Sequence, residues 1–172
     1  MATLPELETA RLTLRRFELD DAPFVVTLLN DPSFISNIGD RGVRSIEDAH
    51  RYLREGPMAM YERFGFGLWH VARKADGAPV GTCGLLKRDY LPDPDVGYAF
   101  LPEYRGMGFA VEAAEATLAH GARKFAMKRV LATVITGNQP SIRVLGKLGM
   151  EFERVLDGKP GEAEVRLYGR RL

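Results

Sequence analysis

The hydrophobic and polar positions along the first half of the chain predict antiparallel strands. Residues 11–17 alternate leucines with polar neighbours, a period of two that is typical of a half-buried strand. Residues 68–73 and 80–87 are two further runs of strand type. The Asp76-Gly77 pair between them favours a tight hairpin turn, so the two runs should pair with each other.

Apolar residues at helical spacing predict two helices in the same half. The first follows Asp20 or Asp21, either of which can cap its start, and should stop at the Asn-Asp-Pro run of residues 30–32. The second follows Ser45, which resembles the start of a capping box with Asp in place of Glu. The Gly-Pro pair at residues 56–57 should break or bend this second helix.

The second half of the chain changes to a strand, helix, strand pattern followed by a closing hairpin. The expected elements are a strand at 95–101, a helix reaching about residue 125, a strand at 129–136, a helix at 138–148, and strands at 150–156 and 165–168. Strands joined through a helix are normally parallel and connected by a right-handed crossover. The predicted fold class is therefore α/β, of mixed α+β type, with helices flanking a mixed sheet.

Length and composition are those of one globular domain spanning residues 1–172. No apolar run approaches the ~18 residues that a membrane helix needs, and the N-terminal segment lacks the apolar stretch of a signal peptide. Cys83 is the only cysteine, so the chain has no internal disulfide. Lys and Arg number 24 against 23 Asp and Glu. We therefore expect a cytoplasmic protein that binds neither membranes nor nucleic acid.

Residues 98–118 place a glycine-containing loop between a predicted strand and the start of the long helix. The first amides of a helix have no acceptor within it and lie at the positive end of its dipole, which favours an anion there. Gly106 and Gly108 let the backbone approach a phosphate, and Arg105 can add a charge-assisted donor for a pyrophosphate. Glycines that only satisfy tight dihedrals would show the same spacing, so the pattern alone leaves both interpretations open.

The loop does not complete the two best-known phosphate signatures. Gly106 and Gly108 begin the dinucleotide pattern G-x-G-x-x-G, but Val111 stands where the third glycine should be. The strand at 129–136 ends without the acidic residue that holds a ribose, and no P-loop lysine follows the glycines. A dinucleotide-dependent oxidoreductase therefore lacks two of its expected features.

The same loop resembles the R-x-x-G-x-A pyrophosphate loop of the GNAT acetyltransferase superfamily. Its six residues are Arg105, Gly106, Met107, Gly108, Phe109 and Ala110. The residues that resemble the family's N-x-x-S/A…K-x-G-F segment are Asn138, Ser141, Lys147 and Gly149, with Met150 at the aromatic position. The starting stretch ETARLTLRRF and the stretch VGYAFLPEYRG are similar to the branch of ribosomal-protein N-terminal acetyltransferases, called RimJ/RimL-like. The resemblance thus covers nearly the whole chain.

This resemblance implies a GNAT-like fold, a central mixed and largely antiparallel sheet whose fourth and fifth strands, here 95–101 and 129–136, splay apart. It implies that acetyl-coenzyme A (acetyl-CoA) binds with its pantetheine arm between those strands and its pyrophosphate on the loop amides. Backbone groups near Phe100 and Leu101 would then pair with the pantetheine. Asn138 would touch the coenzyme arm, and its position also suits a helix N-cap, so both roles are compatible.

The implied reaction is transfer of an acetyl group to a primary amine by direct attack, without a covalent enzyme intermediate. Asp95 is the candidate base, acting through a water relay, because it opens the strand where relatives often carry Glu; the alternative is a solvated strand-end carboxylate. Cys83 has no His or Lys beside it in sequence, so a buried strand thiol is preferred to a nucleophile. Glu112 matches a family glutamate, and its role stays open between packing, capping and chemistry.

The leaving thiolate needs a proton, and the usual donor is missing. Leu145 stands where many relatives carry a tyrosine seven residues after the motif asparagine. Ser141 is the candidate replacement, one helical turn earlier on the same face, although a serine there can also bond only to local backbone. Tyr98 is the second candidate, although strand alternation can turn its hydroxyl away from the cleft.

The predicted function is acetyl-CoA-dependent N-acetyltransfer to a protein or peptide N-terminal amine or to a small amine. The alternative, of a different class, is a noncatalytic acyl-CoA-binding sensor. We expect a monomer or homodimer without a metal site. His70 is interpreted as a surface or hydrogen-bonded residue rather than a substrate contact. Four aromatic residues are interpreted as core rather than as a wall of the acceptor site: Tyr61, Phe64, Phe66 and Trp69.

Overall fold

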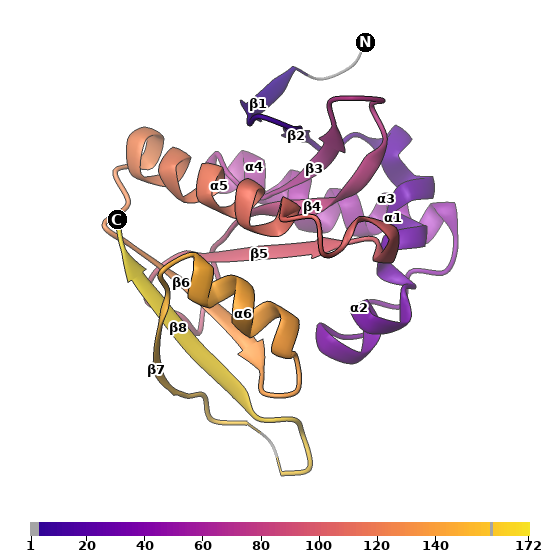
Figure 1. The fold of residues 1–172 in the computed structure, drawn as a ribbon. Helices are drawn as coiled ribbons and strands as arrows, with labels where there is room; N and C mark the ends of the chain where they lie inside the picture. The colour runs from indigo at the N-terminus through magenta and orange to yellow at the C-terminus, as the bar shows by residue number, and fades with distance from the viewer. Residues whose placement is uncertain (1–3, 159) are drawn as a thin grey trace.

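The computed structural model describes residues 4–158 and 160–172, which form one eight-stranded sheet with helices on both faces (Figure 1). The strands are β1 (Pro5–Glu8), β2 (Leu12–Arg16), β3 (Leu68–Arg73), β4 (Pro79–Leu86), β5 (Asp95–Phe100), β6 (Arg129–Ile135), β7 (Glu151–Val155) and β8 (Val165–Arg171). The helices are α1 (Ala22–Leu29), α2 (Pro32–Asn37), α3 (Ile46–Leu53), α4 (Ala59–Phe64), α5 (Phe109–Phe125) and α6 (Gln139–Lys147). Three short helical segments are η1 (Leu19–Asp21), η2 (Arg54–Met58) and η3 (Pro102–Tyr104).

The sheet order is β1-β2-β3-β4-β5-β6-β8-β7, and within the described residues β5 and β6 form its one parallel pair. The other neighbours are antiparallel, including the β3–β4 hairpin that turns at Gly77, where φ is 70°. This arrangement confirms the predicted mixed and largely antiparallel sheet. Since β1 was not predicted, the strands expected as fourth and fifth are β5 and β6.

The parallel pair is short, because β5 and β6 share the register pair Asp95 and Leu131 and then part. Figure 1 shows β6 running downward and away from β5, while β8 and β7 follow β6. The splay that the family resemblance implied is therefore present. It leaves a gap in the ladder between the carboxyl-terminal halves of two neighbouring strands.

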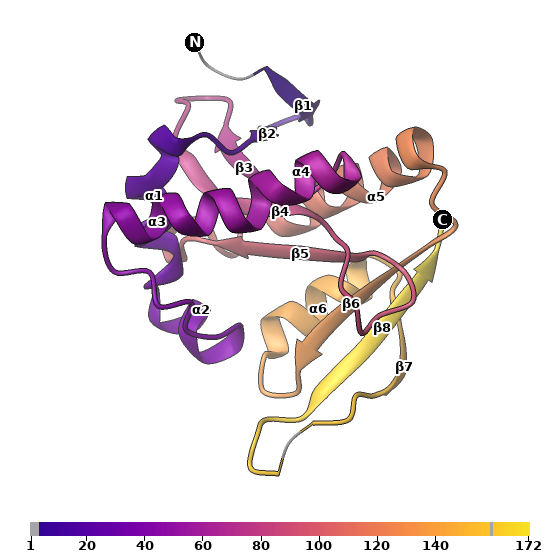
Figure 2. The ribbon, with the colours of Figure 1, turned by 180° about the vertical axis from the view of Figure 1, so that it is seen from behind.

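Helices cover the two faces of the sheet unequally. In Figure 1, α5 and α6 lie in front of the sheet, and Figure 2 shows α1, α3 and α4 on the opposite face. The buried side of α5 is formed by small residues such as Ala113, Ala114 and Gly121, which let the helix approach β4 and β5 closely. Among the described helices, none is both long and apolar enough to cross a bilayer.

The aromatic residues before the first hairpin are part of the core, as predicted. Tyr61, Phe66 and Trp69 are each at most 6% exposed, and Phe64 packs against the same cluster. The Tyr61 hydroxyl accepts a hydrogen bond from the Phe17 amide and donates to the Leu68 carbonyl. These bonds satisfy the polar end of a side chain that is otherwise buried.

The first helix ends at the Asn-Asp-Pro run as predicted, whereas the second helix continues past the expected break. The Asn-Asp-Pro run ends α1 but also starts α2, because Asp31 accepts a hydrogen bond from the Phe34 amide and Pro32 suits the first helical position. The Gly-Pro pair at 56–57 does not break the second helix, because the segment η2 has the wider π-helical hydrogen bonding. The chain stays helical until Gly65, whose φ is 80°.

His70 is neither a surface residue nor a well hydrogen-bonded one. It lies in β3 with 5% of its surface exposed, and its ring packs edge-on against Phe17 and Phe24. Among the described residues its Nδ1 has no hydrogen-bond partner, and its Nε2 is 3.9 Å from Asp21. Burial lowers the pKa of His70 to about 4; the charge of Arg15 acts in the same direction, and that of Asp21 opposes it.

We expect the free energy of unfolding to fall as the pH is lowered from about 6.5 to about 4. In this window the unfolded chain binds a proton at His70 that the folded protein does not bind, so acid favours unfolding. Above pH 6.5 the contribution is complete and constant. The difference between a folded pKa of about 4 and an ordinary value of 6.5 amounts to roughly 3 kcal/mol.

Denaturant unfolding at a series of pH values measures this slope, and His70→Gln should reduce it. The slope should not vanish, because burial also lowers the pKa of His120. His50→Gln, on α3, is the matched control for the replacement of a histidine by glutamine. Equal slopes for the wild type and His70→Gln would show that His70 does not cause the acid sensitivity.

Candidate active site

The loop between β5 and α5 presents unpaired amides at the positive end of α5. Gly106 and Gly108 have left-handed backbone conformations, with φ of 75° and 82°, and Gly108 immediately precedes the helix. The amides of Phe109 and Ala110 lie in the first turn, where no acceptor within the helix is available. A Cβ on Gly106 would meet no atom within 4 Å, and the side chain of Met107 is exposed. The loop is therefore open to an approaching group.

The side chain of Arg105 is occupied by neighbours of the loop. Its Nε donates to the Phe100 carbonyl at 2.9 Å, and its terminal nitrogens donate to Ser33 and Asp31 at 2.6 Å each. Its amide donates to the Pro102 carbonyl. The largely buried Asp31 carboxylate takes the guanidinium as its counter-charge, so a contact of Arg105 with pyrophosphate stays a prediction for its remaining N–H groups.

The gap beside β5 is lined by backbone groups that β6 does not pair. The Leu101 amide donates to the Val80 carbonyl, and its carbonyl accepts from the Tyr104 amide. In an antiparallel ladder alternate residues direct their backbone groups to opposite edges, so those of Tyr98 and Phe100 point away from β4 and toward the gap. The Phe100 carbonyl accepts from the Arg105 Nε, and both backbone groups of Leu101 also have partners. The expected pantetheine contact near Phe100 and Leu101 stays a prediction, and the backbone groups of Tyr98 face the same gap.

Tyr98 and Ser141, the two candidate proton donors, meet across this gap. Their hydroxyl oxygens are 2.8 Å apart, so β5 and α6 are joined by a hydrogen bond. Burial raises the pKa of Tyr98 to about 12, although the bond with Ser141 opposes the rise. The Asn138 side chain accepts from the Ser141 amide at 3.3 Å, which confirms its N-cap role, and Leu145 is buried in the core.

Asp95 lies on the opposite face of the sheet from Tyr98, because the two residues are three positions apart along β5 and side chains alternate between the faces. Its carboxylate is 2% exposed, and the Nε of Arg88 donates to both of its oxygens at 3.1 Å. The alternative of a solvated strand-end carboxylate is therefore wrong. Burial raises the pKa of Asp95, and the charge of Arg88 opposes the rise. A carboxylate with a raised pKa binds a proton more readily than an exposed Asp does, which favours a role as a base.

Cys83 is a buried thiol, as predicted. It has no exposed surface, and its Sγ lies 3.5 Å from the Thr117 hydroxyl of α5. Burial raises the pKa of the Cys83 thiol to about 12, so it is not a thiolate at neutral pH. Structure and sequence agree that Cys83 is not a nucleophile.

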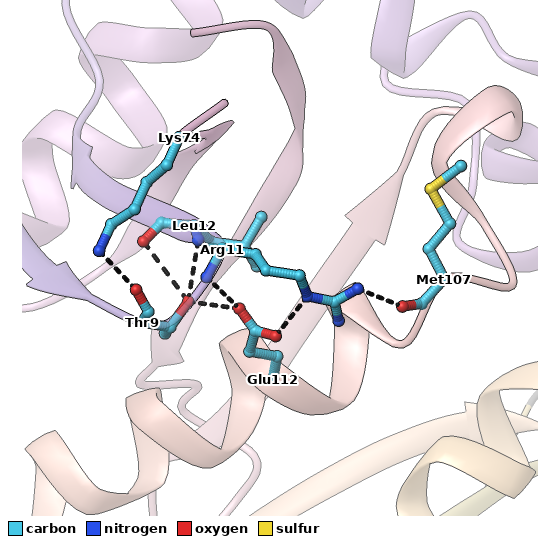
Figure 3. A network of polar contacts seen from close by, with 6 residues as sticks. All are labelled: Thr9, Arg11, Leu12, Lys74, Met107 and Glu112. Atoms are coloured by element: carbon cyan, nitrogen blue, oxygen red, sulfur yellow. Dashed lines mark hydrogen bonds and ion pairs between the residues drawn. The ribbon is translucent and has the colours of Figure 1, made fainter. Parts of the chain in front are cut away.

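Glu112, whose role the sequence left open, holds the β1–β2 turn against the start of α5 (Figure 3). Its carboxylate accepts from the Thr9 hydroxyl at 2.6 Å and from the Nε of Arg11 at 2.8 Å. Arg11 also donates to the Met107 carbonyl of the loop at 2.9 Å. No spacing in the sequence points to Thr9 or Arg11, because their partners lie about a hundred positions further along the chain.

The arrangement fits a ligand that carries a diphosphate and an extended amide-containing arm. Open amides and a helix start suit the diphosphate, and unpaired strand groups beside the gap suit the arm. Within residues 4–158 and 160–172, no group of three or more His, Cys, Asp or Glu side chains is placed to hold a metal ion.

Comparison with known proteins agrees with this geometry. The family model described as an acetyltransferase (GNAT) domain matches residues 11–151. The chain is 30% identical over 147 residues to the N-acetyltransferase YnaD of Bacillus subtilis, which covers 86% of this chain and 83% of YnaD. A GNAT-family acetyltransferase structure from Bacillus anthracis superposes with a TM-score of 0.80 at 26% identity, covering 96% of this chain and 97% of the other.

Two more distant structures share the fold. RimL, a ribosomal L7/L12 alpha-N-protein acetyltransferase crystallised with coenzyme A, has a TM-score of 0.83 at 18% identity over 99% of this chain and 98% of its own. The microcin C7 self-immunity acetyltransferase MccE, crystallised with acetyl-CoA and AMP, has a TM-score of 0.80 at 17% identity over 95% and 93%. The chain belongs to the GNAT family and is an acetyltransferase of that family.

Proposed function

We propose that this acetyltransferase uses acetyl-CoA and transfers the acetyl group to a primary amine by direct attack in a ternary complex. The observation that carries the proposal is the loop of open amides at the start of α5, placed beside the gap between β5 and β6. A single domain over residues 1–172, working in the cytoplasm as a monomer or homodimer, is part of the same proposal.

Five loop residues, from Gly106 to Ala110, are the proposed donors to the diphosphate of the coenzyme. Arg105 would join this set only through its remaining guanidinium N–H groups, because its amide already has a partner and Asp31 holds the guanidinium. The backbone groups of Tyr98 and the amide of Phe100 would bind the pantetheine arm, as an added strand would, because the Phe100 carbonyl already accepts from Arg105. The side chain of Asn138, placed at the start of α6, is the proposed contact to the same arm. Acetyl-CoA supplies a thioester, whose carbonyl is open to attack by an amine.

Asp95 is the proposed base. For this role Arg88 must release one carboxylate oxygen, and a water must connect that oxygen to the amine. Ser141 is the proposed acid, held by the hydroxyl of Tyr98, which can resupply its proton. Asp95 and Ser141 would then act from opposite faces of the sheet, and the reacting groups would lie in the gap between β5 and β6, which connects the two faces.

The proposed acceptor is a protein or peptide N-terminal amine or a small amine. Support for the first comes from fold neighbours that acetylate protein N-termini, among them a Salmonella typhimurium acetyltransferase that modifies the N-terminal serine of ribosomal protein L7/L12. These neighbours include RimL, which is why we place the chain in the RimJ/RimL-like branch. A noncatalytic acyl-CoA sensor is the second candidate, since Arg88 occupies both oxygens of the proposed base.

Acetyl-CoA should raise the thermal midpoint of the protein, and nicotinamide dinucleotides should not. A ligand at ~100 times its dissociation constant that binds only the folded state adds ~2.7 kcal/mol, which is roughly 5–10 °C for a protein of this size. A thermal shift assay with both ligands tests the donor. An equal shift with NAD would contradict the assignment.

A screen of amines and N-terminal peptides with acetyl-CoA, read by the release of free thiol, tests the transfer itself. Product from any amine supports the enzyme. A thermal shift without product from the whole library would favour the sensor.

Gly108→Val should remove acetyl-CoA binding and leave the protein folded, because a branched side chain would cover the amides at the helix start. Gly77→Val is the matched control. It places the same side chain on a glycine of similar positive φ, in open space at the β3–β4 turn. Calorimetric titration should show binding to Gly77→Val and none to Gly108→Val; normal binding to both would place the diphosphate elsewhere.

Ser141→Ala should lower the turnover number by ~100-fold, the usual size of a lost acid, with little change in acetyl-CoA affinity. Tyr98→Phe should cause a smaller loss, because it keeps the serine and removes only its hydrogen-bond partner. Both are measured where chemistry limits the rate. A large loss in Tyr98→Phe with none in Ser141→Ala would make Tyr98 the acid, and no loss in either would leave the proton to water.

A further inference from the structure

The start of β2 is joined to the first turn of α5 by a compact group of polar contacts (Figure 3). Glu112 receives hydrogen bonds from the Thr9 hydroxyl, the Arg11 amide and the Arg11 Nε, at 2.6, 3.0 and 2.8 Å. Lys74 adds a bond to the Thr9 carbonyl at 2.5 Å. The contacts bring residues from the β1–β2 turn and the β3–β4 turn to the end of α5 that carries the loop.

Arg11 extends this group into the loop itself. While its Nε is held by Glu112, a terminal nitrogen donates to the Met107 carbonyl at 2.9 Å. Its guanidinium lies over the Phe109 ring, 4.6 Å from the ring centre, and its other terminal nitrogen is 3.4 Å from where a Cβ of Gly108 would be. One planar side chain therefore contacts Met107 and Phe109, the residues on either side of Gly108.

The bond to the Met107 carbonyl determines where the next amide points. In a trans peptide the C=O and the following N–H point in opposite directions, and the described residues contain no cis peptide. Because the Met107 carbonyl points toward Arg11, the Gly108 amide points away from Arg11 and from the β1–β2 turn. That amide is one of the proposed diphosphate donors.

We propose that Arg11 is a positioning residue that fixes the Met107–Gly108 peptide so that its amide faces the diphosphate of an acyl-CoA. The inference rests on the proposed function, since it needs a diphosphate ligand on the loop. Arg11 acts through the peptide plane, and the ordered peptide lowers the conformational cost of binding. A left-handed glycine such as Gly108 is where the backbone rotates most easily, so this is the peptide that most needs an external contact.

The role depends on the forked shape of the guanidinium, because two acceptors must be reached at once. Partial burial disfavours the charged form of Glu112, but hydrogen bonds from Thr9 and Arg11 hold the pKa of Glu112 below its ordinary value. Glu112 is therefore an ionised partner that fixes one side of the fork while the other side holds Met107. Lysine has the same charge without the fork, so it cannot replace both contacts.

The test compares dissociation constants for acetyl-CoA in the full-length protein, measured by calorimetric titration. Arg11→Met and Arg11→Lys should each weaken binding by about 10-fold or more. Thr9→Val weakens the attachment of the β1–β2 turn to α5 without changing the contacts of the loop, because Arg11 keeps its bonds to Glu112 and to the Met107 carbonyl. Arg170→Met removes another arginine that joins a glutamate of α5, Glu115, to a backbone carbonyl. Both controls should stay within about 3-fold of the wild type.

A spectroscopic measurement separates positioning from a general loss of stability. At saturating coenzyme A, the ³¹P resonances of the bound diphosphate should shift between the wild type and Arg11→Met, while the 3′-phosphate resonance should not. Thermal midpoints of all four variants show whether each is folded under the conditions used.

Each outcome decides the matter. Wild-type affinity in Arg11→Met overturns the inference, and wild-type affinity in Arg11→Lys replaces it with a simple charge effect. Equal weakening of binding in Thr9→Val and Arg11→Met would show that only the attachment of the β1–β2 turn to α5 matters. Unchanged diphosphate resonances would show the same. If the wild type itself does not bind acetyl-CoA, the proposed function fails and the inference fails with it.

Discussion

The parting of β5 and β6 after one shared register pair is the constraint from which the rest of the site follows. A continuous ladder would have paired the backbone groups of Tyr98 and Phe100 with β6, and nothing could have entered there. Because the strands diverge, the sheet itself supplies donors and acceptors for a ligand. The long connection through α5 then brings a helix start to the mouth of the gap.

Two arginines hold the loop from different sides of the molecule. Arg11 connects it to the β1–β2 turn, and Arg105 connects it to the start of α2. Each guanidinium has a carboxylate as one partner and a backbone carbonyl as another. A loop with two left-handed glycines is intrinsically mobile in its backbone, so bonds of this kind define its shape more than its own sequence does.

Local patterns predicted most of the fold, because alternation, helix caps and turn pairs are properties of neighbouring residues. The loop, the Asn138 cap and the buried state of Cys83 were predictable for the same reason. What the local patterns did not predict depends on distant partners. Arg105 was expected at the ligand, and only the fold brings Asp31 within 2.6 Å of it. Leu101 was assigned to the gap, although its backbone pairing is decided by the register of β4.

Asp31 performs two tasks with one carboxylate, since it caps α2 and also receives Arg105. The Ser33 hydroxyl donates to the same Asp31 carboxylate and accepts from Arg105. Replacing α2 with the corresponding helix of a relative, in order to change the surface beside the loop, therefore also replaces residues that hold the loop. Such a graft keeps the loop in place when it carries the Asp-x-Ser start unchanged, and it must also keep the buried Phe34, because this residue of α2 is part of the core.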